Sequence, residues 1–319
     1  MDIPIPDSWD EALTMLIPAV RRATEPAHAF ESERNDRSNR LVRRPFAPCL
    51  SELVMLDLPD VRLFVNQGHL DRWGVSPDDA FEAAHEVMKD HATAGLQFND
   101  TYGVWQLDAP DGAATSRLVL DGWLRAFDGL VAGRPVAIAP WRRLLMVGGL
   151  DDDAQVGRLL DIAEEGWRRA PSPTTPALYT TDQAGRTVAL KTSPVTRRHT
   201  RIERGHRTLA MAVYAEQREM VQPHTSTQLA ALQLEQHSET GEALTWVSWS
   251  ESTPEVWLPK ADFVQLSSEA GEAWVTWETL RQLAPKALTR LDLHPTRYRT
   301  TWPTIKQVYA LISASEPRE

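Results

Sequence analysis

The first candidates for chemistry are two histidines in one polar stretch, His85 and His91. Zinc-binding helices place two histidines four residues apart so that both rings lie on one helix face. Here the spacing is six residues, which separates the rings by about 120° around a helix. Four histidines of the second half are too widely spread to indicate a cluster: His199, His206, His224 and His237. We therefore predict no metal site.

Nucleophile and cofactor motifs are the next candidates. Cys49, the only cysteine, is followed by an apolar stretch, so we predict a small buried side chain and not an activated thiolate. The chain has no Gly-x-Ser-x-Gly, Gly-x-Gly-x-x-Gly or Walker motif. Gly148-Gly149 precedes a helix that begins with three aspartates, and these would repel a phosphate. We predict no bound cofactor.

Tryptophan is unusually frequent, with 12 residues in the chain. Indole rings can stack on a base, a sugar or a cation, although most tryptophans pack in cores. On a regular strand Trp246 and Trp249 would face opposite sides, so at most one of them belongs to a given platform. We name Trp246 and Trp257 as candidate ligand-binding residues and expect core packing for most of the others.

The composition limits the classes of partner and compartment. The 319 residues are 42% hydrophobic and 24% charged, which is ordinary globular usage, and the formal net charge is −10. That charge repels phosphate chains at long range, so we expect no nucleic-acid partner. A single cysteine, no signal-peptide pattern and no long apolar run lead us to expect a cytoplasmic protein without membrane association. The oligomeric state is left open.

Helices and strands must position the residues discussed above. The spacing of hydrophobic residues along the sequence predicts where these elements lie. In the first half we expect helices at 9–22, from 77 to about 94, at 116–130 and from 151 to about 169, a polar connector at 31–44, strands at 50–57, 61–66, 96–99, 103–107, 135–140 and 144–147, and a hairpin at 179–191. In the second half we expect helices at 206–221, 277–283 and 305–312, strands at 227–236, 243–250, 256–259 and 263–266, and a short element at 291–293.

Residues 191–207 carry six lysines and arginines against one acid, Glu203, and show no apolar period. We interpret this segment as an exposed linker between two domains. The segments 136–147 and 255–266 also resemble each other, because each has an apolar strand, a proline, polar positions and a second apolar strand. A duplicated strand–proline–strand–helix unit would explain the likeness, and so would chance.

Four motifs occur in succession between residues 46 and about 185. They are Leu53-Val54-Met55-Leu56-Asp57-Leu58-Pro59-Asp60, Gly68-His69-Leu70-Asp71-Arg72-Trp73-Gly74-Val75-Ser76-Pro77-Asp78-Asp79, Ser116 with Leu118, Leu120 and Trp123, and Pro135-Val136-Ala137-Ile138-Ala139-Pro140-Trp141-Arg142-Arg143-Leu144-Leu145. In this order they resemble the YtpQ-like proteins, an uncharacterised bacterial family. The resemblance covers somewhat under half of the chain and implies a cytoplasmic bacterial α+β protein, with no activity to carry over.

One position departs from the family pattern of proline, any residue, arginine, aspartate and an apolar residue. Pro140 and Arg142 match it, whereas Arg143 stands where the aspartate is expected. An arginine–aspartate pair there could orient a substrate carboxylate or hold a turn. The replacement reverses the charge and removes that pair.

Hairpins are frequent and no βαβ alternation runs through the chain, so we predict an α+β fold with mixed, mainly antiparallel sheets and flanking helices. Two domains are expected, with four segments in all: an N-terminal helix and connector at 1–45, a YtpQ-like α+β domain at 46–190, the basic linker at 191–207 and a Trp-rich α+β domain at 208–319.

Two classes of function are compatible with the sequence. The first is a non-catalytic binding, scaffold or regulatory protein with a protein partner, which fits the missing catalytic motifs, the scattered charge and the surplus tryptophan. The alternative is a small-molecule enzyme whose site is assembled at a cleft between the two domains. The alternative predicts that one pocket holds several of five residues: Arg142, Arg143, Asp57, His69 and Asp262.

Overall fold

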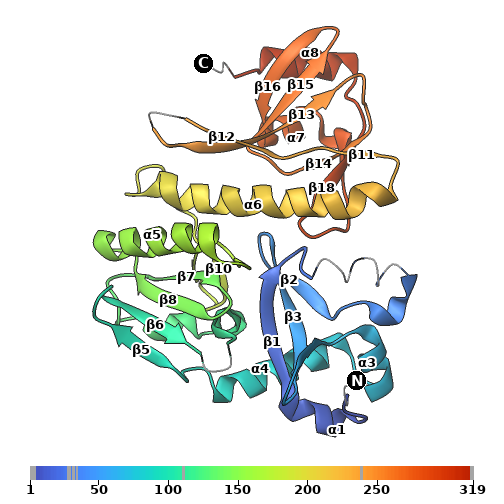
Figure 1. Ribbon diagram of the computed structural model, residues 1–319. Helices are drawn as coiled ribbons and strands as arrows, with labels where there is room; N and C mark the ends of the chain where they lie inside the picture. The colour runs from blue at the N-terminus through green and yellow to red at the C-terminus, as the bar shows by residue number, and fades with distance from the viewer. Residues whose placement is uncertain are drawn as a thin grey trace. The chain divides into compact units, whose positions relative to one another are not determined.

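A computed structural model of the chain describes residues 5–26, 30, 33, 35–109, 112–237 and 240–316 (Figure 1). The chain forms two compact units, Met1–Gly205 and His206–Glu319. Each combines helices with mainly antiparallel sheets, so the predicted α+β class is confirmed. The boundary between the units falls inside one helix, α6 (His199–Val221).

Unit 1 begins with a sheet in the order β1-β3-β2, with β4 paired to β3. The elements of this part are α1 (Trp9–Ala12), β1 (Leu16–Arg22), β2 (Arg43–Ala47), β3 (Leu50–Asp57), β4 (Arg62–Phe64), α3 (Gln67–Trp73) and α4 (Pro77–Asp90). One face of the sheet packs against α4, where Leu16, Val54 and Leu56 share a core with Phe81. Because side chains alternate along a strand, the next residues of β1 and β3 point to the opposite face.

The second sheet of unit 1 has the order β10-β9-β7-β8-β6-β5. Its elements are β5 (Leu96–Asn99), β6 (Val104–Asp108), β7 (Pro135–Trp141), β8 (Leu144–Gly149), α5 (Asp153–Arg169), β9 (Leu178–Thr181) and β10 (Thr187–Ala189). Helix α5 lies along β7 and β8 (Figure 1). Its apolar side, including Val156 and Leu160, packs on Ile138 and Met146 of these strands.

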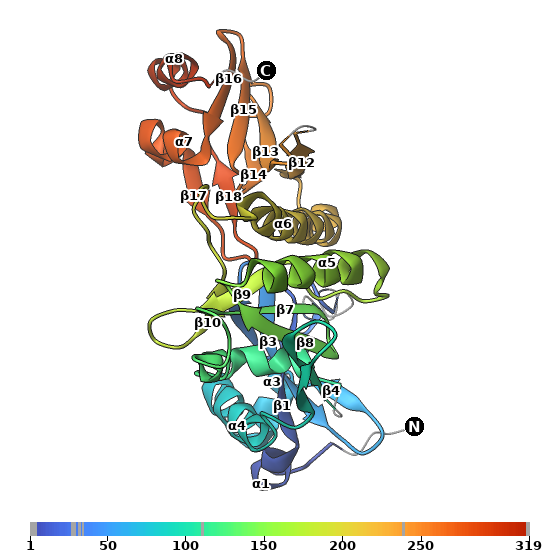
Figure 2. The same ribbon diagram turned by 90° about the vertical axis from the view of Figure 1, so that its left-hand side faces the viewer.

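Unit 2 contains two further sheets, in the orders β11-β14-β18-β17 and β12-β13-β15-β16. Its elements after α6 are β11 (Gln228–Leu229), β12 (Gln233–Gln236), β13 (Ala243–Ser250), β14 (Val256–Pro259), β15 (Phe263–Ser268), β16 (Gly271–Thr276), α7 (Trp277–Leu283), β17 (Leu288–Arg290), β18 (Arg297–Thr300) and α8 (Ile305–Ser313). Helices α7 and α8 contact β16 (Figure 2). Trp249 and Trp277 are buried in the core beneath.

Two predicted helices of unit 1 are wrong. Most of 9–22 is strand β1, which pairs antiparallel with β3 from Leu16 to Arg22; Pro18 inside this segment lacks the N–H that a helix needs. The segment 116–130 forms two short 3₁₀ helices, Ala114–Val119 and Leu124–Phe127. Gly122 between them has a φ of 79°, which interrupts any continuous right-handed helix. The predicted separate N-terminal region, 1–45, is also wrong in part, because β1 and β2 belong to the sheet of β3.

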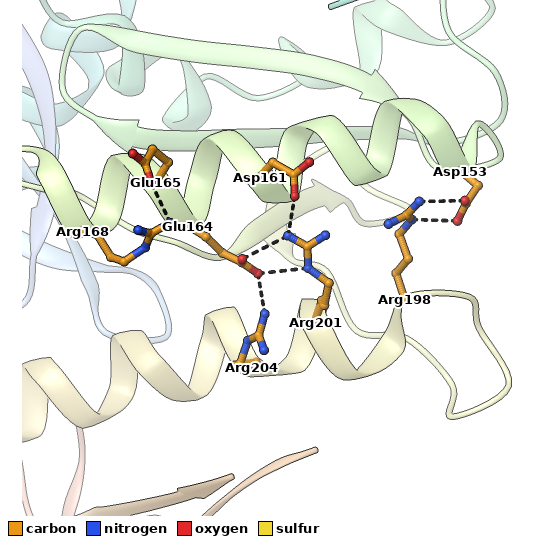
Figure 3. Close-up of polar contacts among 8 residues, drawn as sticks. All are labelled: Asp153, Asp161, Glu164, Glu165, Arg168, Arg198, Arg201 and Arg204. Carbon is orange, nitrogen blue, oxygen red and sulfur yellow. Dashed lines mark hydrogen bonds and ion pairs between the residues drawn. The ribbon is translucent and has the colours of Figure 1, made fainter. Parts of the chain in front are cut away.

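The basic segment 191–207 is helical from His199 onward, contrary to the prediction of an exposed linker. Its arginines pair with acids of α5 (Figure 3). Arg198 donates two hydrogen bonds to Asp153, at 2.8 and 2.9 Å, and Glu164 accepts from Arg201 and Arg204 at 3.1 and 2.8 Å. These ion pairs flank Ile202, which is buried in the core of unit 1. One apolar residue among charged ones gives no hydrophobic periodicity from which the start of the helix could be predicted.

The two segments that resemble each other in sequence do not share a topology. Strands β7 and β8 pair with one another as an antiparallel hairpin. Their counterparts, β14 and β15, belong to different sheets. Strand β16 also intervenes before the next helix, α7. The structure therefore gives no support to a duplicated strand–proline–strand–helix unit.

A fully buried arginine, Arg297, ties the elements of unit 2 together. Its Nε donates to the side-chain oxygen of Gln217 at 2.7 Å, and its two Nη atoms donate to the carbonyl oxygens of Ala230 and Tyr214, each at 2.9 Å. The guanidinium also lies 5.2 Å from the centre of the Tyr214 ring. Burial lowers the pKa of Arg297 to about 10. Carbonyl oxygens therefore solvate this charge, and no carboxylate of a described residue pairs with it.

Replacing Arg297 with methionine should lower the free energy of unfolding of unit 2 by about 3 kcal/mol, since it leaves buried acceptors without donors. Urea unfolding followed by tryptophan fluorescence measures this change. Arg299→Met on the same strand is the matched control, because Arg299 is exposed and should shift stability by no more than about 0.5 kcal/mol. Equal effects of the two variants would contradict the structural role of the buried guanidinium.

Candidate functional site

The β3–β4 hairpin fixes the first of four arginines that surround one cavity. Asp57 and Arg62 are directly opposed residues of the two strands. Arg62 donates from Nε to Oδ1 of Asp57 at 2.7 Å and from Nη2 to Oδ2 at 3.2 Å. Such a two-bond pair orients the planar guanidinium. Asp57, a predicted site residue, thus acts by holding Arg62.

The β7–β8 turn carries two more arginines, Arg142 and Arg143, which the sequence analysis also named. Thr115 anchors the turn, because its N–H donates to the carbonyl of Arg142 and its hydroxyl to that of Trp141, both at 3.2 Å. The strand register shifts between Ile138 and Trp141. A shift of this kind redirects the side chains that follow it. Arg142 and Arg143 are exposed and form no ion pair with any described residue.

Arg21, near the end of β1, is the fourth arginine and is partly buried. Its Nη1 donates to the carbonyl of Val20 at 2.8 Å, and its Nη2 lies 3.7 Å from the sulfur of Met55. The guanidinium carbon lies 6.0 Å from the centre of the Phe64 ring. Among the residues described, no carboxylate pairs directly with Arg21.

These four arginines line a cavity of about 530 Å³, which we call the arginine pocket. It lies on the face of the first sheet opposite α4, between that sheet and the β7–β8 turn. Apolar side chains form most of the remaining wall, including Ile17, Ala19, Met55 and Phe64, and Ser116 adds one hydroxyl-bearing residue. Its described lining contains no histidine, cysteine, lysine or carboxylate.

The charges in the arginine pocket repel one another. Burial, followed by repulsion from Arg142, lowers the pKa of Arg21 to about 10, and the attraction of Glu25 offsets only part of this. Guanidinium groups still carry their charge at neutral pH when the pKa is this high. Since guanidinium forks match carboxylate and phosphate oxygens, an anion is the species that would relieve the repulsion.

His69, another predicted site residue, has a structural role at the start of α3. Its backbone N–H donates to the side-chain oxygen of Asn66 at 3.0 Å, and the N–H of Asn66 donates back to Nδ1 of His69 at 3.2 Å. The imidazole stacks on Trp73 with 5.6 Å between ring centres. Burial, followed by repulsion from Arg72, lowers the pKa of His69. It is not part of the arginine pocket.

Asp262, the fifth residue predicted for a shared pocket, belongs to unit 2. It accepts from Nε of Arg207 at 2.8 Å and from the N–H of Thr245, also at 2.8 Å. Burial favours its neutral form, but these partners outweigh burial and hold the pKa of Asp262 below its ordinary value. The side chain therefore connects α6 to β13 and does not line the arginine pocket.

The tryptophans between 246 and 277 divide into two groups. Trp249 and Trp277 are buried, while Trp246, Trp257 and Trp274 are partly exposed. Trp246 meets Trp274 edge to face, with 5.1 Å between ring centres. The predicted candidates Trp246 and Trp257 therefore lie on unit 2, and neither lines the arginine pocket.

Sequence reasoning missed Arg21 and Arg62. The interpretation of 9–22 as a helix placed Arg21 on the wrong type of element, and the scattered basic residues gave no local pattern. The usable signal was Pro18, which argues against a helix and for a strand on which Ile17, Ala19 and Arg21 share one face.

Other chemistry finds little support in the part of the chain that the structure describes. No group of three or more histidine, cysteine, aspartate or glutamate side chains converges there to hold a metal ion. None of the described helices has the length and apolar character needed to cross a membrane. Cys49 is buried, as predicted, and burial raises the pKa of its thiol to about 12.

Comparison of the chain with models of protein families, with curated proteins and with solved structures found no match. The resemblance to the YtpQ-like proteins therefore stays a prediction.

The repulsion within the arginine pocket predicts that Arg142→Gln raises the melting temperature at low ionic strength, because it removes a like charge near Arg21. The gain should shrink at high salt, where screening weakens the repulsion. Thermal unfolding at two chloride concentrations measures this. Arg290→Gln serves as control, since Arg290 is exposed on β17 of unit 2. A melting temperature that falls at low salt would contradict the electrostatic account.

Proposed function

We propose that this chain is a non-catalytic binding protein that recognises a small organic anion in the arginine pocket. The observation that carries the proposal is that Arg21, Arg142 and Arg143 line one cavity without a carboxylate partner among the described residues. Of the three, Arg21 is partly buried, and natural proteins seldom leave such a charge unpaired, because desolvation is costly. Arg142 and Arg143 are exposed and add two further guanidinium groups at the mouth of the same cavity. A carboxylate or phosphate group would supply the missing partner through charge-assisted hydrogen bonds.

The size and wall of the pocket support a small molecule. A volume of about 530 Å³ lies within the range of small-molecule sites. Met55 and Phe64 offer apolar contact beside the guanidinium groups, which favours an anion with an organic part. General acid–base catalysis needs a group that can exchange protons near neutral pH, and the described lining has none. Binding is therefore favoured over the alternative of an enzyme.

The overall charge supports a small anion over a polyanion. The chain has a formal net charge of −10, which repels a nucleic acid over its whole length. A single anionic group meets only the local field of the four arginines. The cytoplasm remains our proposed compartment, because the only cysteine cannot form an intramolecular disulfide.

The test is calorimetric titration with pyrophosphate and with citrate, which present phosphate and carboxylate chemistry. Wild-type protein should bind at least one of them, and Arg21→Gln or Arg142→Gln should weaken binding about tenfold or more, the value of one charge-assisted hydrogen bond. Arg290→Gln, remote in sequence and in the other unit, should leave the affinity unchanged. Heat changes that are identical in all four proteins would sink the proposal.

A protein partner remains a second proposal, favoured by one surface of unit 2. Ile305 and Tyr309 of α8 are 64% and 57% exposed, and they are four residues apart, which places them on one side of the helix. Exposed apolar side chains that cluster in this way mark protein contacts more often than isolated ones do.

Immobilised wild-type protein should then retain a discrete partner from a cell extract, and Tyr309→Ser should release it because the ring contributes much of the apolar contact. Val195→Ser is the matched control, since Val195 is 92% exposed in unit 1. Mass spectrometry of the bound fraction gives the answer. A fraction that is the same for wild-type and Tyr309→Ser would count against this surface.

A further inference from the structure

A second and larger cavity adjoins the arginine pocket across the β7–β8 turn. It has a volume of about 930 Å³ and is lined by the turn, by Tyr102 and by the second half of α5 with the residues that follow it. We call it the α5 groove. Arg142 and Arg143 line both the α5 groove and the arginine pocket. One ligand could therefore contact these two arginines and extend into both spaces.

The wall of the α5 groove includes an indole that is held in a fixed position. Trp141 is partly exposed, and α5 crosses directly beside its ring. A Cβ added at Gly166 would lie only 2.6 Å from Cζ3 of Trp141 and 2.7 Å from Cβ of Pro140. Because Gly166 has no side chain, the backbone of α5 packs directly against the indole of Trp141. Tyr102, 39% exposed, supplies a second aromatic ring to the groove.

The charged side chains that α5 contributes to the groove are paired, whereas Arg142 and Arg143 at its border with the arginine pocket have no ion pair with a described residue. The carboxylates of the groove are already paired: Asp161 and Glu164 with Arg201, and Glu165 with Arg168 (Figure 3). Glu165 also pairs with Arg169. A second anionic group would therefore find no unpaired cation among the residues of α5 that line the groove. The groove offers aromatic faces together with a polar rim, which suits a planar and uncharged group with hydrogen-bonding edges.

These observations lead us to propose that the two cavities form one site for a nucleoside phosphate. Its phosphates would lie among Arg21, Arg142 and Arg143, and its base would stack on Trp141. Stacking on an aromatic face is available to every base, and the rim carboxylates can accept hydrogen bonds from ribose hydroxyls and amino groups. An alkyl chain fits less well, because a charged rim leaves it poorly desolvated. This inference rests on the proposed anion-binding function.

A ligand series on the full-length protein separates the inference from its premise. Calorimetric titration would compare pyrophosphate, adenosine, adenosine diphosphate and dodecyl phosphate. Adenosine diphosphate should bind about fivefold or more tightly than pyrophosphate, the contribution of one stacked base. Adenosine alone should bind weakly, because it lacks the anionic group.

Two variants locate the base. Trp141→Leu should abolish the advantage of adenosine diphosphate over pyrophosphate while leaving pyrophosphate binding intact. Trp274→Leu, a partly exposed tryptophan of unit 2, should preserve that advantage. Because Trp141→Leu could disturb the strand, saturation-transfer NMR on wild-type protein gives an independent measure. The adenine H2 and H8 protons should receive saturation, and excess pyrophosphate should remove it.

Each outcome has a separate meaning. Equal affinity for pyrophosphate and adenosine diphosphate would overturn the nucleoside inference and leave the anion-binding function standing. If dodecyl phosphate bound more tightly than adenosine diphosphate, the α5 groove would be a site for an alkyl chain and not for a base, and the nucleoside inference would be overturned. Failure of every ligand in the series, together with citrate, would overturn both proposals.

Discussion

The repulsion among the guanidinium groups of the arginine pocket is the constraint on which our functional interpretation depends. Arg21, which is partly buried, is repelled by Arg142 and more weakly by Arg62, and repulsion between like charges is unfavourable to the fold that holds them together. Their positions are maintained from outside the pocket, by the Asp57–Arg62 pair and by the two hydrogen bonds of Thr115 to the β7–β8 turn. The grouping of arginines around this pocket is therefore unfavourable to the stability of unit 1, and electrostatically unfavourable groupings of this kind are common at binding sites.

Arginine has three different roles in this chain, and the partner of each side chain distinguishes them. Arg297 is buried and solvated by carbonyl oxygens, which connects the elements of unit 2. Arg201 is paired with the carboxylates of α5, which fixes the first turns of α6. Arg142 and Arg143 have neither kind of partner among the described residues and face a cavity. Only the third arrangement leaves hydrogen-bonding capacity for a ligand.

The sequence predicted the features that depend on local pattern and missed those that depend on distant partners. Alternation along 243–250 indicated a strand with Trp246 and Trp249 on opposite faces, and Ser76 before Pro77 indicated the start of α4, where Ser76 accepts from the N–H of Asp79. The start of α6 was missed, because its stability comes from carboxylates about 40 residues earlier in the chain.

The candidate site shows the same division. Arg142, Arg143 and Asp57 were selected from the sequence; the two arginines line the arginine pocket, and Asp57 lies outside its lining, bonded to Arg62. His69 and Asp262 were selected on residue type alone, yet the first caps α3 and the second anchors Arg207. The contacts that give His69 and Asp262 these roles form only in the folded chain, so residue type could not predict them. Residue type therefore identified side chains that could bind an anion, and the strand alternation of β1 and β4 determines that Arg21 and Arg62 line the same cavity as the two arginines of the β7–β8 turn.

The location of the arginine pocket has a consequence for the stability of unit 1. Arg21 and Arg62 belong to the first sheet, whereas Arg142 and Arg143 belong to a turn of the second. An anion that bonds to both pairs would cross-link two sheets that repel each other at this point. Binding free energy would then appear as added stability of the contact between the sheets. Because the same turn forms one wall of the α5 groove, an anionic group bound to the turn would lie directly beside Trp141, whose indole already packs against α5, so the rest of the same molecule would meet a preformed surface.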